Sequence, residues 1–231
     1  MSYGLTVRNN DNYLQIDSEK PRLCAVHNGT YQATSESTAR VVFSKPITTQ
    51  EPPCIFVQNS PEQPDVMYTG MMLSGSPYNW TGFSLTPVNI QMRPKGKWFA
   101  AVFSATTESL YGMRLWDENG SPIYDTGTAP VIVTKASHTW LNPERVQIGT
   151  NAFAFRYNST MVSSILSDEY FMINPFSRSA LTQVFYTVPT GVKYDWQSQR
   201  LQIFIVTNIS GGIVWNDIGQ YAGIFARLPG T

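Results

Sequence analysis

The stretches Tyr3–Asp17 (YGLTVRNNDNYLQID) and Tyr111–Asp125 (YGMRLWDENGSPIYD) resemble each other at a constant spacing of 108 residues. Repetition of a unit at fixed spacing is the sequence signature of a duplicated structural element. The repeat therefore predicts a chain built from two related β units. The equivalent positions that match are Tyr3 and Tyr111, Gly4 and Gly112, Leu5 and Met113, Val7 and Leu115, Asn9 and Asp117, and Asp17 and Asp125.

Each copy of the repeat has the pattern of a β-hairpin. Aliphatic residues alternate with polar ones on both sides of a polar turn, at residues 10–12 in the first copy and 118–120 in the second. The Asn119–Gly120 pair is the stronger turn signal, because both central positions of a type I′ turn need a positive φ that Asn and Gly tolerate. We therefore expect one hairpin near the start of each half.

The rest of the sequence predicts an all-β fold, because strand-like runs recur and no run keeps a helical period. We expect two tandem β-sandwich-like domains from an internal duplication, residues 1–108 and 109–231, with the boundary in the polar stretch 104–109. A boundary near residues 135–138 is the alternative, and it would let the two hairpins pair within one domain. The expected strands cover residues 5–9, 12–17, 22–26, 39–43, 54–59, 66–73, 83–90, 97–103, 112–117, 122–125, 131–135, 151–157, 169–174, 182–188, 201–207 and 212–217.

The charge balance limits the classes of partner. Sixteen Lys and Arg residues balance 16 Asp and Glu residues, and charged residues are 14% of the 231 residues, against about 25% in an average soluble domain. A surface with so few charges is expected of a subunit whose surface is largely buried against neighbouring subunits, but it is also typical of neutral all-β proteins. The lack of a basic excess argues against nucleic acid as a partner.

Two features of the sequence bear on the location of the protein, the N-terminal residues and the cysteines. Residues 1–11 lack the basic start and apolar run of a signal peptide, and no stretch reaches the roughly 18 apolar residues of a membrane span. We therefore expect a soluble cytoplasmic product without membrane insertion. Cys24 and Cys54 are the only cysteines, and each lies in an apolar run, so we expect two buried free thiols.

The sequence predicts no catalytic, metal or cofactor site. His27 and His138 fit loop histidines hydrogen-bonded to the backbone, without the spacing of metal ligands. Residues 93–98 (RPKGKW) look like a basic turn that lacks phosphate-loop spacing, so we expect solvated lysines. Asp168 and Glu169 would point to opposite faces of a strand, which argues against a glycosidase pair.

Asp17 and Asp125 are the carboxylates that the two hairpins share. Calcium needs six or more oxygen ligands, and neither copy has enough acidic residues nearby to supply them. A carboxylate directly after a strand also suits a turn, where it accepts backbone N–H bonds. We therefore expect both residues to shape turns.

Several of these segments resemble a pattern in small virion proteins of tailed bacteriophages, which are associated with the tail tip, baseplate or tail fibres. The segments are Met1–Leu5, Ile16–Ser18, Asp117–Gly120 and Ile123–Asp125. The resemblance implies a structural, non-enzymatic tail subunit that is assembled in the bacterial cytoplasm and located in the virion. It also implies docking on other phage tail proteins and a homo-oligomer, trimeric or higher. The sequence lacks Gly-X-Y runs and heptads, which argues against a long fibre shaft.

Two sets of residues are the candidates for contacts. The candidate docking hairpins are marked by Tyr3, Gly4, Asp17, Tyr111, Gly112 and Asp125. Aromatic residues in polar loops either plug the core, contact another subunit or stack on a sugar or receptor. The candidate receptor or partner contacts of this kind are Tyr78, Trp80, Tyr194 and Trp196.

Three functions are consistent with the sequence. The first is a structural component of the tail tip or baseplate that docks through its hairpins, because strand addition needs few particular side chains. The second is a host receptor-binding tail protein that recognises a surface polysaccharide or pilus through the aromatic loops. The third is a carbohydrate-binding module outside virions, which the lack of a secretion signal argues against.

Overall fold

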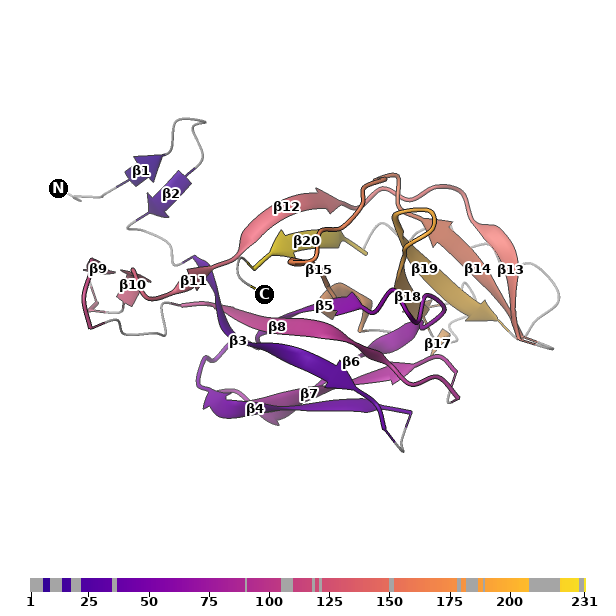
Figure 1. Ribbon diagram of the computed structural model, residues 1–231, viewed down its shortest axis with the longest axis horizontal. Coiled ribbons are helices and arrows are strands. Elements are labelled where there is room, and N and C mark those ends of the chain that lie inside the picture. Colours follow the sequence, from indigo (N-terminus) through magenta and orange to yellow (C-terminus); the bar gives the residue numbers. More distant parts are fainter. Residues whose placement is uncertain are drawn as a thin grey trace.

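The computed structural model shows a protein built from β-strands, which confirms the predicted all-β fold (Figure 1). Its one helical element in the described part of the chain is the short 3-10 helix η1 (Asn174–Phe176). The structure describes residues 6–8, 14–17, 22–34, 37–89, 91–104, 110–117, 119–120, 122–149, 152–177, 180–181, 187–188, 190–207, 221–228 and 231.

Two seven-stranded antiparallel sheets form the body of the molecule. The first, here named the curled sheet, has the order β11-β3-β8-β5-β15-β20-β12, and the second sheet has the order β13-β14-β19-β18-β6-β7-β4. The strands of the curled sheet are β3 (Leu23–Gln32), β5 (Cys54–Asn59), β8 (Lys95–Phe103), β11 (Ala129–Pro130), β12 (Ile132–Ser137), β15 (Glu169–Met172) and β20 (Gly223–Arg227). The strands of the second sheet are β4 (Ala39–Ile47), β6 (Tyr68–Ser76), β7 (Asn79–Pro87), β13 (Glu144–Gly149), β14 (Ala152–Asn158), β18 (Thr190–Asp195) and β19 (Arg200–Thr207).

In the part of the chain that the structure describes, three two-stranded sheets lie outside these two. They are β1 (Thr6–Arg8) with β2 (Leu14–Asp17), β9 (Arg114–Trp116) with β10 (Pro122–Asp125), and β16 (Ala180–Leu181) with β17 (Thr187–Val188). The first two are the hairpins that the repeat predicts, and both are confirmed. In Figure 1 they lie at the end of the molecule where β3 begins.

The curled sheet bends until its two edges meet. Its edge strands β11 and β12 are consecutive in the chain and are separated only by Val131. The first pairs with β3 and the second pairs with β20, so one continuous segment holds both edges. The Val131 N–H donates to the Leu23 carbonyl at 2.9 Å, which continues the β3 pairing to the seam. The sheet therefore resembles a small barrel rather than a flat layer.

The curl gives its strands two buried faces. One face encloses a small aromatic core in which the rings of Phe56 and Phe99 stack at 4.5 Å and Tyr170 meets Phe99 edge-on at 4.9 Å. The other face packs against the second sheet in the main core, which includes Trp98 and Phe171. Burial on both faces explains why β5 and β8 read as nearly continuous apolar runs instead of alternating ones.

Both sheets combine strands from the two halves of the chain. In the curled sheet β5 pairs with β15, with Val57 opposite Phe171. In the second sheet β6 pairs with β18, with Tyr68 opposite Val192. The main core accordingly contains residues from both sides of the predicted boundary at 108/109, which lies in a stretch outside the described residues. Residues 1–108 and 109–231 are therefore not separately closed sheets, although the sandwich-like layering is present.

The two hairpins have the same strand register. Thr6 faces Asp17 in the first hairpin, and Arg114 faces Asp125 in the second, each 108 residues further along. Both ladders also shift register at the same place, before the pairs Arg8–Leu14 and Trp116–Pro122. The two copies of the sequence repeat therefore have the same strand pairing, including the shift in register. The hairpins do not pair with each other in the described part of the chain.

The turn of the second hairpin differs from the predicted type I′. The Gly120 N–H donates to the Asp117 carbonyl at 3.1 Å, and the Asn119 N–H donates to the Asp117 carboxylate at 2.9 Å. Gly120 has a φ of 79°, whereas Asn119 has no positive φ. The Asp117 side chain therefore stabilises a different turn, in which Gly120 alone supplies the left-handed conformation. The predicted turn at residues 10–12 and the predicted strand at residues 212–217 lie outside the described residues.

The aromatic core inside the curl sets a test of the fold. Phe99→Ala removes a fully buried ring between Phe56 and Tyr170, so we expect a loss of about 3–5 kcal/mol in the free energy of unfolding, measured by urea denaturation. Phe103→Ala on the same strand is the control, because Phe103 is exposed and should cost no more than about 0.5 kcal/mol. Equal losses in the two variants would contradict the enclosed core.

Candidate functional site

Asp125 fixes the exit of the second hairpin. Its carboxylate is buried, accepts the Gly127 N–H at 2.7 Å and contacts the Arg114 Nε at 2.7 Å. Its carbonyl accepts the Thr128 hydroxyl at 2.7 Å. The predicted role of Asp125 in a turn is therefore confirmed, and the ion pair with Arg114 adds a cross-strand link that the sequence reading missed. Asp17 lies at the equivalent position in β2, opposite Thr6.

Gly112 is required by the approach of two chain segments. It has a φ of 128°, and a Cβ built there would lie 1.8 Å from the Thr126 Oγ1, which donates to the neighbouring Tyr111 carbonyl at 3.3 Å. No L-residue with a side chain fits this position without moving the backbone. This explains the Tyr-Gly pair of the repeat in its second copy. Tyr3 and Gly4, the equivalent residues of the first copy, lie outside the described residues.

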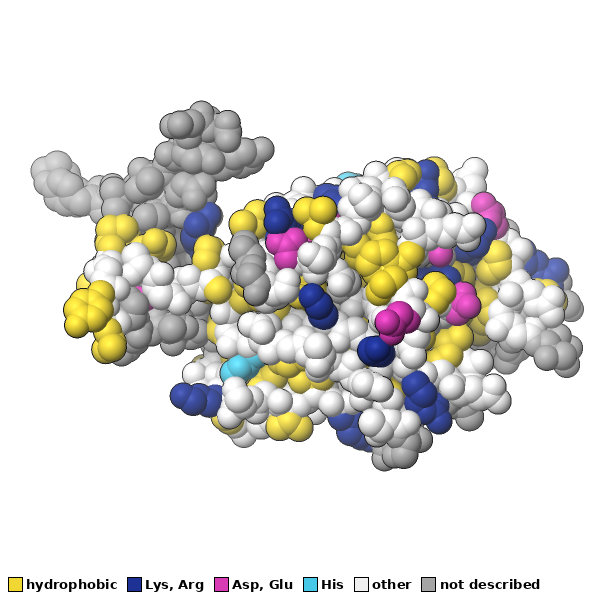
Figure 2. All heavy atoms as spheres, viewed as in Figure 1, with side chains coloured by type: hydrophobic (Ala, Val, Ile, Leu, Met, Phe, Trp, Pro, Cys, Tyr) yellow, Lys and Arg dark blue, Asp and Glu magenta, His cyan; other side chains and the backbone are white. Residues whose placement is uncertain are grey.

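An exposed apolar surface covers the second hairpin and the residues before it. This hairpin patch consists of Leu110, Tyr111, Met113 and Trp116, and the exposed fractions of Leu110, Tyr111 and Trp116 are 93%, 90% and 54%. The Arg114 guanidinium lies over the Trp116 ring, 5.8 Å from its centroid. Figure 2 shows hydrophobic side chains gathered at the end of the molecule where β9 and β10 lie. Large apolar side chains gathered on one exposed element mark an interaction surface.

Tyr78 and Trp80, two predicted contact residues, have different environments. Tyr78 is 61% exposed at the β6–β7 turn and has a φ of 68° directly after Pro77, where glycine is the usual residue. Trp80 is half-buried and packs against the main core. The Thr49 carbonyl accepts both the Tyr78 N–H at 3.0 Å and the Trp80 Nε1–H at 3.1 Å. Tyr78 therefore remains a contact candidate, while Trp80 anchors the turn.

Tyr194 serves the core, so its prediction as a receptor or partner contact is wrong, whereas Trp196 packs beside it and is partly exposed. Tyr194 is buried and donates its hydroxyl hydrogen bond to the Ser163 carbonyl at 2.7 Å. Burial raises the pKa of Tyr194 to about 12. The half-buried Trp196 ring meets Tyr194 edge-on at 5.1 Å and packs against the main core. The polar residues around them in sequence did not signal exposure.

His27 and the carboxylates at 168 and 169 have structural partners. The His27 Nε2 lies 2.9 Å from the Lys45 carbonyl, so the predicted bond to backbone is confirmed, although His27 lies in β3 and not in a loop. Asp168 accepts two hydrogen bonds from Arg227, at 3.0 Å and 2.7 Å. Glu169 is buried and pairs with the Lys135 Nζ at 3.0 Å. The two carboxylates thus have different partners, although Asp168 lies in a turn before β15 and the segment is not extended there as predicted.

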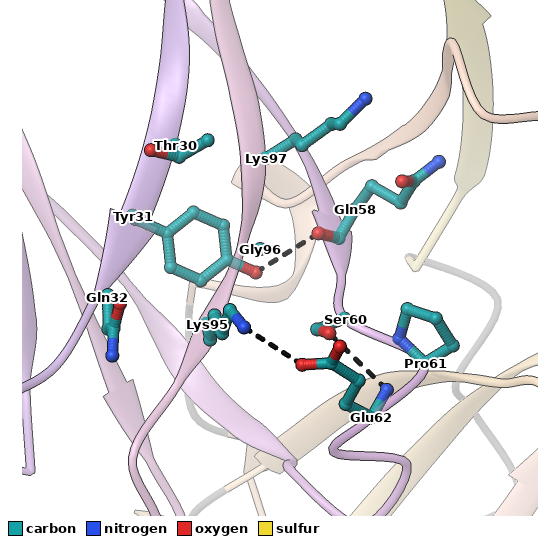
Figure 3. Close-up of a pocket in the computed structure, with 10 residues that line it drawn as sticks. All are labelled: Thr30, Tyr31, Gln32, Gln58, Ser60, Pro61, Glu62, Lys95, Gly96 and Lys97. Atoms are coloured by element: carbon teal, nitrogen blue, oxygen red, sulfur yellow. Dashed lines mark hydrogen bonds and ion pairs between the residues drawn. The ribbon is translucent and has the colours of Figure 1, made fainter.

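A pocket of about 360 Å³ opens across three neighbouring strands of the curled sheet (Figure 3). Its residues come from β3, β5, β8 and the loop after β5: Thr30, Tyr31, Gln32, Gln58, Ser60, Pro61, Glu62, Lys95, Gly96 and Lys97. The prediction of a basic turn at residues 93–98 is corrected in part, because residues 95–98 form the start of strand β8. Lys95 is exposed to solvent, as predicted, and its Nζ forms a surface ion pair with the Glu62 carboxylate at 2.8 Å. The sequence missed this pocket because it forms only when distant strands pair.

Gly96 lets the strands around the pocket approach closely. A Cβ at this position would lie 2.1 Å from the Gln58 carbonyl and 2.5 Å from the Tyr31 hydroxyl. The buried Tyr31 hydroxyl instead contacts the Tyr68 hydroxyl at 2.6 Å. Burial raises the pKa of both phenols, so both stay protonated at neutral pH. The absence of a side chain at Gly96 therefore lets Tyr31, a residue of the main core, lie directly beside the pocket.

Comparisons with known proteins give no relative for this chain: no family model, curated protein or solved structure matches it. The described residues contain no helix that is long and apolar enough to cross a membrane. In the same residues no three His, Cys, Asp or Glu side chains come together in a way that could hold a metal ion. Cys24 is buried and Cys54 is half-buried, and both are free thiols.

The strained conformation of Tyr78 gives a second test. Glycine adopts a positive φ without a Cβ clash, so Tyr78→Gly should stay within about 1 kcal/mol of the parent in free energy of unfolding. The β-branched Tyr78→Val should lower it by about 1–2 kcal/mol. Urea denaturation of the two variants measures the difference. Both variants lack the phenol ring, so a glycine variant less stable than the valine variant would contradict backbone strain as the dominant effect at this turn.

Proposed function

We propose that this chain is a structural subunit of a tailed-phage virion, in the tail tip or baseplate, that docks on neighbouring tail proteins through its two repeated hairpins. The observation that carries the proposal is the hairpin patch of Leu110, Tyr111, Met113 and Trp116, exposed on β9 and on the residues directly before it, outside both large sheets. The resemblance of the hairpin segments to small tail proteins is the reason for proposing a phage tail as the assembly.

An isolated two-stranded hairpin is marginally stable in water, and it has two strand edges with unpaired backbone groups. The second hairpin is held at its base by Asp125 and by the Thr126–Tyr111 contact, whereas its apolar side chains are open to solvent. Docking on a neighbouring subunit would cover these side chains and pair an edge with a further strand. Such a role needs backbone edges and apolar area, and it needs no catalytic group.

The equal register of the two hairpins supports two equivalent docking elements. Residue 131 lies 108 positions after residue 23, and these two residues are joined by the Val131 N–H to Leu23 carbonyl bond at the seam. The adjoining pairs, Cys24 with Pro130 and Ala25 with Ala129, form an antiparallel ladder. The seam thus joins two residues that have the same spacing of 108 as the matched residues of the hairpins.

The test is incorporation into particles. In the phage that encodes the chain, the double variant Tyr111→Ser with Trp116→Ser should lower the amount of the protein per purified virion by about tenfold, because exposed aromatic anchors carry most of the energy of an interface. Quantitative mass spectrometry of the particles measures this. The matched control is Val42→Ser with Met72→Ser, which replaces two residues of the second sheet that are 82% and 72% exposed. Normal incorporation of the Tyr111 and Trp116 variant would refute docking through the hairpin patch.

A host receptor-binding role is the second candidate, and exposed, strained Tyr78 favours it, because strain of this kind persists at functional positions. The same particle experiment separates the two roles. Tyr78→Ala particles that contain normal amounts of the protein but fail to adsorb to the host would support receptor binding to a surface polysaccharide or pilus. Normal adsorption of these particles would leave the structural role alone.

A further inference from the structure

We propose that the pocket across β3, β8 and β5 binds an acidic sugar, with Lys97 as the residue that receives its negative charge. The ligand class is a saccharide unit that bears a carboxylate or a phosphate group. This inference rests on the pocket alone and is independent of docking through the hairpins.

The strand register arranges the polar side chains of the pocket in rows. Thr30 faces Lys97 on one side, and Gln58 faces Lys97 on the other, so a hydroxyl, an ammonium and an amide lie side by side across three strands. Gln32 faces Lys95 in the adjoining row. Alternation along β8 places Lys97 on the same face as Phe99, which lies in the core enclosed by the curl. The pocket is therefore the polar mouth of the curled sheet, a position where barrels commonly bind small molecules.

The charges in the pocket leave one cation available. Lys95 is neutralised by Glu62 at 2.8 Å, and Figure 3 shows the two side chains turned toward each other. Lys97 has no ion-pair partner within the described residues, and Figure 3 shows it extending toward the side of the pocket where Gln58 lies. The nearby Asp168 is already held by Arg227 at 2.7 Å. Lys97 is close enough to Asp168 to help lower the pKa of that carboxyl group, but Asp168 is bonded to Arg227, so an anion entering the pocket would meet an ammonium group that forms no ion pair within the described residues.

The rest of the pocket suits hydroxyl groups. The Gln58 amide nitrogen is fixed by the carbonyls of Leu166 and Glu169, at 2.9 Å and 2.7 Å, which gives this wall a set position. Thr30, Gln32 and Ser60 contribute side chains that both donate and accept hydrogen bonds. A volume of about 360 Å³ lies at the lower end of the range for small-molecule sites, and it admits one or two sugar units. A polar, hydroxyl-bonding pocket with one free ammonium group therefore fits an acidic sugar better than an apolar ligand.

The experiment is ligand titration of the full purified chain by saturation-transfer NMR and calorimetry. The probes are D-glucuronate, α-D-glucose 1-phosphate and, as the neutral comparison, D-glucose. We expect saturable binding of at least one acidic probe, and about tenfold weaker binding by Lys97→Gln, because a hydrogen bond to a charged group is lost. Lys45→Gln, which removes an exposed lysine of β4, is the matched control and should bind as the parent does.

The outcomes separate the two sources of charge. Binding of glucuronate alone assigns the site to carboxylate sugars, and binding of the phosphate probe alone assigns it to phosphorylated ones. If Lys97→Gln has a lowered melting temperature, Thr30→Val takes its place, and weaker binding by that variant supports the pocket. Binding of neither acidic probe, equal binding of D-glucose, or unchanged binding by a folded Lys97→Gln protein would overturn the proposal. None of these results depends on particle assembly, so failure here is distinguishable from failure of the docking role.

Discussion

The seam at Val131 is the constraint on which the rest of the structure depends. One short segment pairs with β3 before this residue and with β20 after it, so the two edges of the curled sheet are held together by continuous backbone. Closure covers edges that would otherwise be exposed, and it encloses Phe56 and Phe99 in a second core. It also fixes the mouth of the curl, where the polar pocket lies. The second core follows directly from this one connection.

The sequence predicted those features that depend on neighbouring residues. Both hairpins, most strands and the turn role of Asp125 followed from alternation and turn chemistry, which act over a few positions. Strands β13 and β18 were missed because their apolar residues are few and are separated by polar ones, such as Gln147 in β13 and Lys193 in β18. The pairing of β5 with β15 could not be predicted, since an apolar run does not specify its partner among many similar runs. The shared core of the two halves depends on that pairing.

The same difference between local features and tertiary pairing explains which candidate site residues were predicted correctly. Tyr111 and Gly112 were identified by repetition, which is visible in sequence, and they lie at an exposed and tightly folded part of the hairpin. Tyr194 was misassigned because polar neighbours in sequence say nothing about the strands that pack over a side chain. The environment of Lys97 was missed for the opposite reason, because its row partners come from β3 and β5. Exposure and charge pairing are tertiary properties, so the sequence alone could identify candidate residues but could not show which of them are exposed or how their charges are paired.

The internal repeat has a geometric meaning beyond duplication of a motif. If two copies of a unit are joined by simple translation, residues 108 positions apart lie far from each other, but here residues 23 and 131 are joined by a backbone hydrogen bond beside the antiparallel ladder of β3 and β11. That is the relation found at the two-fold axis of a symmetric dimer, where each position contacts its own counterpart. Each hairpin ends six residues before this contact, at Asp17 in the first copy and at Asp125 in the second. A partner that engages both hairpins would therefore need two equivalent sites related by a similar axis, and a partner with one site would leave the second hairpin uncovered.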